Sequence, residues 1–187
     1  MLILQTGDPI VDQSGESPSV VLGSTPGNTA ASALRFYSEF ANPLRSSYSW
    51  NSSLPNSRDT FAAEEVAIYF GLASDYPVIT KKNPHIDFDV ATVPQSSSPK
   101  ALRATYTHVY GVALVKSSKN LSKAFEAAWF MVFQDFSLKL PDVLRLPPAR
   151  RDILGTGSKD RVLSIFYDGA IIGRTWLDPE PKGSTGI

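Results

Sequence analysis

The residue types that perform most nucleophilic and acid–base catalysis are sparse in this sequence. The two histidines, His85 and His108, lie in different expected elements, and neither belongs to an HxxxH or HExxH arrangement. No Gly-x-Ser-x-Gly motif marks a nucleophilic serine. Gly155 and Gly157 flank a single threonine, which is too short for a phosphate-binding loop. The sequence therefore indicates no catalytic residue and favours a protein that is not an enzyme.

Two pairs of carboxylates are the remaining candidates for catalysis, because glycosidases use two carboxylates. Glu64 and Glu65 are adjacent on an expected helix, so their side chains point in different directions. Asp87 and Asp89 alternate on the polar face of an expected strand, where water solvates them. A hydrolase therefore stays open only as a minor alternative.

Aromatic residues outside any core pattern are the more informative feature. Tyr48 and Trp50 lie in the polar segment from Ser46 to Arg58, and Trp176 follows a helix pattern just before Asp178. An aromatic ring beside Asp, Asn or Arg groups can pack on the C–H face of a neutral polyhydroxylated ligand while the polar groups bond its hydroxyls. These aromatics indicate a solute-binding surface, unless each indole only fills a packing gap or anchors its loop.

The composition narrows the classes of partner. The chain has 187 residues, is 42% hydrophobic and carries 18 basic and 18 acidic residues, so it can fill one domain or large lobe and has no charge excess for nucleic acid. It contains no Cys, which excludes disulfides and Cys-based zinc sites. We expect no cofactor and no metal. The start of the chain lacks the basic region of a signal peptide, and no run is long enough for a membrane span.

Apolar spacing predicts most of the secondary structure. Helical spacing predicts helices over residues 29–41, 59–65, 72–83, 121–136, 148–154 and 158–174. Continuous or alternating apolar runs predict strands over residues 66–70, 86–93 and 105–115, the first of them buried on both faces. Residues 8–28 are expected to form a loop or loose hairpin, and residues 175–187 an extended tail. This order of elements indicates an α/β fold.

Four segments, in order, resemble the second half of the family 1 extracellular solute-binding proteins, the group similar to maltose-binding protein. They are Phe36–Pro43 (FYSEFANP) with Tyr48–Asn51 (YSWN); Phe61–Gly71 (FAAEEVAIYFG); Phe88–Pro94 (FDVATVP) with Tyr110–Val115 and Ser117–Phe133; and Leu146–Arg151 (LPPARR) through Arg174–Pro179 (RTWLDP). Together they cover roughly residues 30 to 180. Glu65 departs from the family pattern, which has glycine or a small residue near that point.

The resemblance implies a periplasmic-binding-protein-like fold of type II. In that fold residues 1–104 and 141–187 would belong to the C-terminal lobe, and residues 105–140 would form a strand-helix unit that belongs to the other lobe. The first half of such a protein would hold the signal peptide, the lipid-anchored cysteine and the first lobe. The full-length parent would be extracytoplasmic, either periplasmic or anchored to the membrane.

The function implied by the resemblance is capture of a sugar or oligosaccharide for uptake by an ABC permease. The alternatives are the same fold binding a peptide or another solute, and a stand-alone interaction module. Trp50 and Trp176 would supply stacking faces, and Asp75 and Arg174 hydrogen bonds. The full set of implied ligand-binding residues is Tyr48, Trp50, Asn51, Ser74, Asp75, Tyr106, Tyr110, Arg174, Trp176 and Asp178.

The same resemblance predicts self-association. The run 105–115 and the helix 121–136 would lack the lobe partners that they have in the family, which leaves apolar surface exposed. We therefore expect this chain to dimerise, swap or repack, or to bind ligand weakly.

Overall fold

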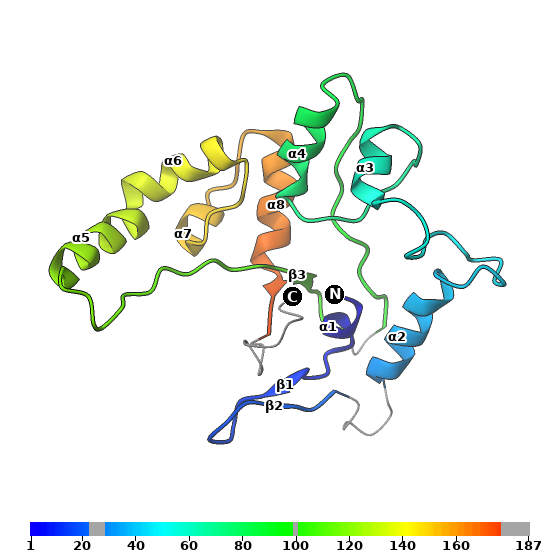
Figure 1. The fold of residues 1–187 in the computed structure, drawn as a ribbon, viewed down its shortest axis with the longest axis horizontal. Helices are drawn as coiled ribbons and strands as arrows, with labels where there is room; N and C mark the ends of the chain where they lie inside the picture. Colours follow the sequence, from blue (N-terminus) through cyan, green and yellow to red (C-terminus); the bar gives the residue numbers. More distant parts are fainter. Residues whose placement is uncertain (23–28, 99–100, 177–187) are drawn as a thin grey trace. The chain divides into compact units, whose positions relative to one another are not determined.

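The computed structural model describes residues 1–22, 29–98 and 101–176 (Figure 1). The helices in these ranges are α1 (Leu2–Thr6), α2 (Thr29–Glu39), α3 (Ser57–Ala62), α4 (Asp75–Lys82), α5 (Leu121–Val132), α6 (Gln134–Leu144), α7 (Arg151–Leu154) and α8 (Arg161–Ile171). The strands are β1 (Val11–Asp12), β2 (Ser19–Val20), β3 (Thr105–Tyr106) and β4 (Gly173–Arg174).

The chain divides into two compact units, between which it passes four times. Unit 1 comprises residues 1–57, 93–107 and 172–187, and unit 2 comprises residues 58–92 and 108–171. The assignment of residues 1–104, 105–140 and 141–187 to lobes of a binding protein stays a prediction.

Unit 1 is assembled around the buried side chain of Gln5 in α1. Its Nε2 donates to the backbone oxygens of Pro94 at 3.0 Å and Ala104 at 3.2 Å. Its backbone oxygen accepts the N–H of Leu102 at 2.9 Å. Since a buried amide without partners is costly, these bonds fix α1 against the segment that leads into β3. Helix α2 packs on α1, as Figure 1 also shows.

Two small sheets complete unit 1. Strands β1 and β2 are antiparallel, with Val11 opposite Val20, so of the loop or loose hairpin expected over residues 8–28 the structure shows a hairpin over residues 11–20. Strands β3 and β4 are parallel, with Thr105 opposite Gly173 and Tyr106 opposite Arg174. This second pairing joins positions that are far apart in the sequence and so fixes the start of the C-terminal segment in unit 1.

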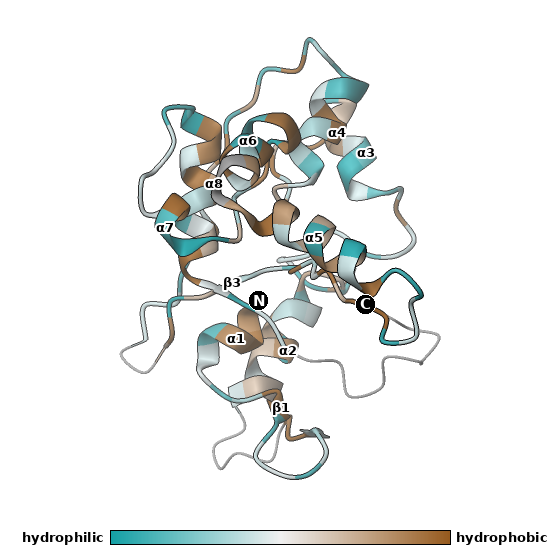
Figure 2. Cartoon of the chain, turned by 90° about the vertical axis from the view of Figure 1, so that its left-hand side faces the viewer, coloured by the Kyte–Doolittle hydropathy of each residue, from teal (hydrophilic) through white to brown (hydrophobic). Residues whose placement is uncertain are grey.

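Unit 2 has its core on α8. Leu163 and Tyr167 of α8 are buried together with Leu154 of α7, and Phe166 packs against them. Figure 2 shows hydrophilic and hydrophobic residues in α7, and the apolar Leu154 at its end belongs to this core. The ring of Tyr76 in α4 then links Phe166, 6.0 Å away, to Phe88, 5.6 Å away. Aromatic contacts therefore extend the core of unit 2 from α8 to α4.

Helix prediction from apolar spacing is confirmed in existence and approximate position for α2, α3, α4, α5, α7 and α8. The helix expected over residues 121–136 is broken at Phe133, whose backbone is extended with ψ of 150°. A separate helix, α6, starts directly after it and contains Pro141. Helix α1 was not predicted.

Two strand predictions are wrong. Residues 66–70 form no strand, and Ile68 and Phe70 are exposed, because Tyr69 instead turns onto Asp75 in the connection between α3 and α4. Residues 86–93 also form no strand, although burial alternates over residues 86–90 as expected. There Phe88 packs on the rings of Phe61 and Tyr76, so side-chain contacts replace a hydrogen-bonded neighbouring strand.

The third strand prediction, over residues 105–115, holds only for the two residues of β3. The observed sheets have two strands each, and the periplasmic-binding-protein-like α/β fold stays a prediction. None of the helices in the described ranges has the length and apolar character needed to cross a bilayer.

Leu163 provides a test of the unit 2 core, because its side chain is only 1% exposed. We expect Leu163→Ala to lower the free energy of unfolding by about 2–5 kcal/mol, since the lost contacts leave a cavity. Urea denaturation followed by circular dichroism measures this loss. Leu138→Ala, at a residue of the same unit that is 45% exposed, is the control and should lose clearly less. Equal losses would contradict the core as described.

Candidate ligand-binding site

Strands β3 and β4 bring three of the implied ligand-binding residues together. The N–H of Thr105 donates to the oxygen of Ile172 at 3.2 Å, and the N–H of Thr107 donates to the oxygen of Arg174 at 3.0 Å. Trp176 follows β4 by two residues, and the centroid of its ring lies 4.9 Å from that of Tyr106 in β3, with an angle of 37° between the ring planes. An aromatic pair at this distance is stabilising beyond its burial, so Tyr106 holds the indole in place.

Trp176 and Arg174 line a hollow of about 270 Å³ in unit 1. The hollow is lined by Leu4, Gly7, Asp8, Pro9, Ile10, Val11, Gln13, Leu102, Arg174, Thr175 and Trp176. Its volume is close to the lower end of the roughly 300–1,000 Å³ typical of small-molecule pockets. Apolar walls with an indole, a guanidinium, a carboxylate and an amide suit a small polar solute.

Asp8 is a member of this hollow that sequence reasoning missed. Its N–H donates to the Oγ1 of Thr6 at 3.3 Å, which fixes the backbone after α1. Its Oδ2 atom is buried and has no hydrogen-bond partner within the described part of the chain. A buried polar atom left unpaired destabilises the fold, so a donor brought by a ligand would be favoured here. The sequence offered no signal for Asp8 beyond its place in a turn.

The implied residues Tyr48, Trp50 and Asn51 lie in unit 1 but do not line the hollow. The N–H groups of Ser49 and Trp50 both donate to the oxygen of Phe40, at 2.9 and 3.2 Å. The Nδ2 of Asn51 donates to the oxygen of Ala41 at 3.4 Å. These bonds fold the loop back onto the residues after α2, with Tyr48 and Trp50 half-buried.

Asp75, another implied ligand-binding residue, is engaged in unit 2. Its Oδ1 accepts from Nη1 of Arg58 at 3.1 Å, and its Oδ2 accepts from the hydroxyl of Tyr69 at 3.1 Å and from the N–H of Leu72 at 2.9 Å. The carboxylate thereby ties α3, the 66–72 connection and α4 together. Burial, followed by the negative charge of Asp75, raises the pKa of Tyr69 to about 12.

Of the last three implied residues, Ser74 and Tyr110 line neither the hollow nor the contacts around Asp75. Ser74 is exposed at the start of α4, and its side chain makes no capping bond. Tyr110 is 91% exposed on the extended segment before α5. Asp178 lies outside the described residues. Their role as ligand contacts stays a prediction.

One member of each carboxylate pair considered for hydrolysis forms a contact within the protein. Asp89 forms an ion pair with Arg161 and accepts the N–H of Val90. Glu64 accepts from Nδ2 of Asn83 at 3.0 Å. In the ranges that the structure describes, no three His, Asp or Glu residues gather in a way that could hold a metal ion.

No protein-family model, curated protein or solved structure matches this chain. The chemistry of the hollow therefore follows from its own residues. Trp176 offers an apolar ring face, Arg174 offers only donors, and Asp8 in its charged form offers only acceptors.

The burial of Tyr69, together with its contact to Asp75, predicts a pH dependence of stability. The pKa of Tyr69 is raised from 10 to about 12 in the folded state, so this contribution is complete below pH 10 and is lost as the pH rises toward 12. We expect the unfolding free energy of the wild type to fall more steeply over this range than that of Tyr69→Phe. Denaturation at several pH values measures the two slopes, and parallel slopes would contradict the assignment.

Gly71 is required for the same contact. A Cβ at this position would lie 2.7 Å from Oδ2 of Asp75 and 2.8 Å from Cζ of Tyr69, closer than real Cβ atoms approach. We expect Gly71→Ala to destabilise the protein by about 1–3 kcal/mol through this overlap. Gly15→Ala is the matched control, since the nearest atom to its added methyl would be the backbone oxygen of Ser17 at 3.8 Å, an ordinary contact distance. A melting temperature unchanged by both substitutions would show that Tyr69 and Asp75 move aside without cost and would contradict this requirement.

Proposed function

We propose that this chain is the ligand-binding portion of an extracytoplasmic solute-binding protein that captures a sugar or oligosaccharide for an ABC transporter. The observation that carries the proposal is the hollow beside β4, where Trp176, Arg174 and Asp8 line one space. The resemblance in the sequence motifs points in the same direction and is independent of this geometry.

The chemistry of an uncharged sugar fits these three residues. The C–H face of a sugar ring packs on an indole, and its hydroxyls both donate and accept hydrogen bonds. Arg174 can donate to the ring or hydroxyl oxygens, while the carboxylate of Asp8 can accept from hydroxyl groups. A small rotation of that carboxylate toward the hollow would let a ligand hydroxyl satisfy Oδ2, which has no partner in the described residues.

Tyr106 acts in this proposal as a positioning residue. Its ring packs against one part of the Trp176 ring, and its backbone belongs to the strand that pairs with β4. The indole therefore meets a ligand from a fixed position and loses little side-chain freedom on binding. Binding is the whole function in this account, and no bond of the solute is made or broken.

The proposal is tested by titrating the protein with glucose, with maltotriose and with a trialanine peptide, and following tryptophan fluorescence. We expect a sugar to change the emission and Trp176→Ala to weaken its binding at least about tenfold. Trp129→Phe, on α5 in unit 2, is the control and should bind as the wild type does.

Three results would contradict the proposal. Binding of the peptide but of neither sugar would favour another solute. Loss of sugar binding in Trp50→Ala with none in Trp176→Ala would place the site on the loop after α2. Cleavage of a chromogenic glycoside that is abolished in Asp87→Asn or Asp89→Asn would make the protein an enzyme.

A further inference from the structure

Residues 109–115, which lie between β3 and α5, are apolar and belong to no helix or strand. Residues 109–115 (VYGVALV) contain no charge and no proline. Five large side chains of this segment are well exposed: Val109 70%, Tyr110 91%, Val112 60%, Leu114 39% and Val115 67%. Within the described residues, the backbone of residues 109–114 forms no hydrogen bond with another segment. Backbone N–H and C=O groups that are left without partners, as at the edge of a sheet, are a template for pairing with another chain.

The segment is also complementary to itself. When it is read in both directions from Val112, Gly111 is matched with Ala113, Tyr110 with Leu114, and Val109 with Val115. Antiparallel pairing of two copies about Val112 would therefore place large residues opposite large ones and small residues opposite small ones. Directly opposite residues have their Cβ atoms about 4.5–5.5 Å apart, so each of these pairs would be in contact. An unrelated partner would not require this symmetry.

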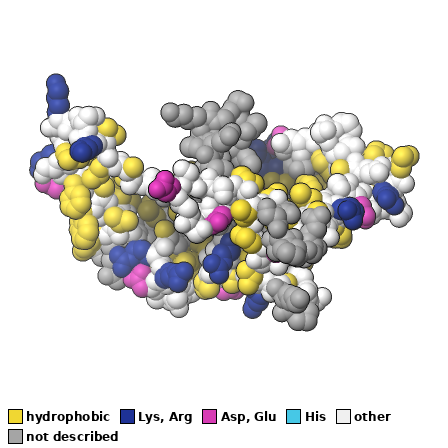
Figure 3. Space-filling view, turned by 90° about the horizontal axis from the view of Figure 1, so that it is seen from below, with side chains coloured by type: hydrophobic (Ala, Val, Ile, Leu, Met, Phe, Trp, Pro, Cys, Tyr) yellow, Lys and Arg dark blue, Asp and Glu magenta, His cyan; other side chains and the backbone are white. Residues whose placement is uncertain are grey.

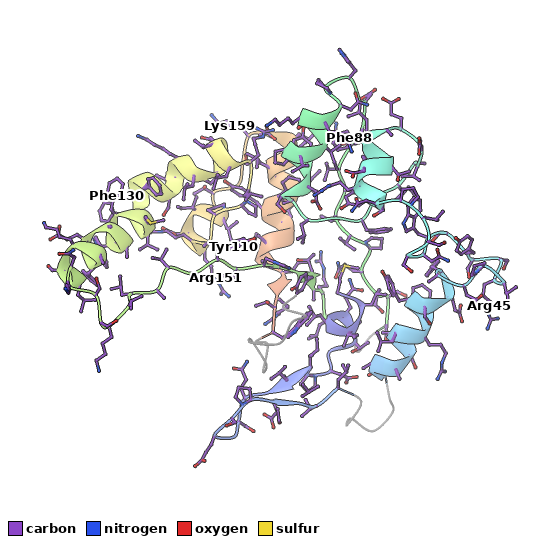
Figure 4. All side chains as sticks on the ribbon, viewed as in Figure 1. Arg45, Phe88, Tyr110, Phe130, Arg151 and Lys159 are labelled. Carbon is purple, nitrogen blue, oxygen red and sulfur yellow. The ribbon has the colours of Figure 1, made fainter. Side chains whose placement is uncertain are left out.

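Helix α5 adds a second apolar surface a few residues further along. None of its residues is buried. Seven large apolar side chains are exposed on α5 and at the residue directly after it: Leu121, Phe125, Trp129, Phe130, Met131, Val132 and Phe133. Figure 3 shows hydrophobic side chains gathered over the region of α5, and Figure 4 labels Phe130 on this helix and Tyr110 on the segment before it.

The exposed apolar area is sufficient for a dimer. Twelve large side chains, each roughly half exposed, present on the order of 1,000 Å² of apolar surface per copy. A standard stable interface buries about 800 Å² per partner. Monomeric proteins rarely expose a contiguous apolar patch much above a few hundred Å².

We propose that two copies of this chain pair antiparallel through residues 109–115, about a two-fold axis at Val112. The interface is isologous, as in most homodimers, because the same segment serves both copies. The α5 helices follow the paired segments after a turn of five residues and become covered in the same dimer. This inference concerns unit 2 only and does not rest on the proposed solute-binding function.

The chain has no Cys, so introduced cysteines report directly on the pairing. Two Val112 residues would face each other with Cα atoms about 4.5–5.5 Å apart, within the range that a disulfide spans. We expect Val112→Cys to form a disulfide-linked dimer under mild oxidation, detected on a non-reducing gel. Val143→Cys, on α6 and at a residue 77% exposed, is the control and should remain mainly monomeric.

The register is tested by mixing two variants. Val109→Cys and Val115→Cys should cross-link to each other more than either cross-links to itself, because the antiparallel register places these positions opposite one another. Equal cross-linking of every combination, including Val143→Cys, would mean random collision and would overturn the proposal.

The association itself is measured by sedimentation velocity at concentrations up to about 100 μM, where a Kd of about 10 μM gives mostly dimer. We expect Val112→Lys to weaken dimerisation at least about tenfold, since it places two charges opposite each other. Val143→Lys should leave the dimer unchanged. A monomeric wild type, or a dimer that Val112→Lys does not weaken, would overturn the proposal.

Discussion

The buried amide of Gln5 is the interaction on which the candidate site depends. Two donors and one backbone acceptor of this residue hold residues 94, 102 and 104 against α1. Ala104 is fully buried in that contact, and β3 begins at the next residue. Because β3 then pairs with β4, the same interaction determines where Tyr106, Arg174 and Trp176 lie. A buried amide that donates to two separate backbone oxygens fixes one arrangement more strictly than an apolar contact of equal size.

Different interactions stabilise the interior of each unit. Unit 1 has few large buried side chains and relies on backbone and amide hydrogen bonds around Gln5 and β3. Unit 2 relies on Leu163 and on a chain of aromatic contacts from Phe166 to Phe61, with the Asp75 carboxylate joining its first two helices. The exposed apolar residues of α5 and of 109–115 contribute to neither arrangement.

The sequence was informative where local periodicity decides the structure and uninformative where distant segments meet. Helices such as α2 and α8 follow from apolar spacing, because one face of each element must be buried. The run 66–70 has strand propensity but no neighbouring strand in the structure, and propensity alone does not form a sheet. The pairing of residue 105 with residue 173, which assembles the candidate site, leaves no local pattern. Asp8 and Gln5 are single polar residues whose importance comes only from what surrounds them.

The most direct test of the solute-binding account is fluorine NMR of protein labelled with fluorotryptophan, since the chain has only three tryptophans. Assignment by substitution of Trp50, Trp129 and Trp176 gives one resonance for each position. On addition of the sugar that binds, the account expects the Trp176 resonance to move while the Trp129 resonance stays unchanged. A Trp176 resonance that does not respond at saturating ligand would contradict the central claim that this indole forms the wall of the binding site.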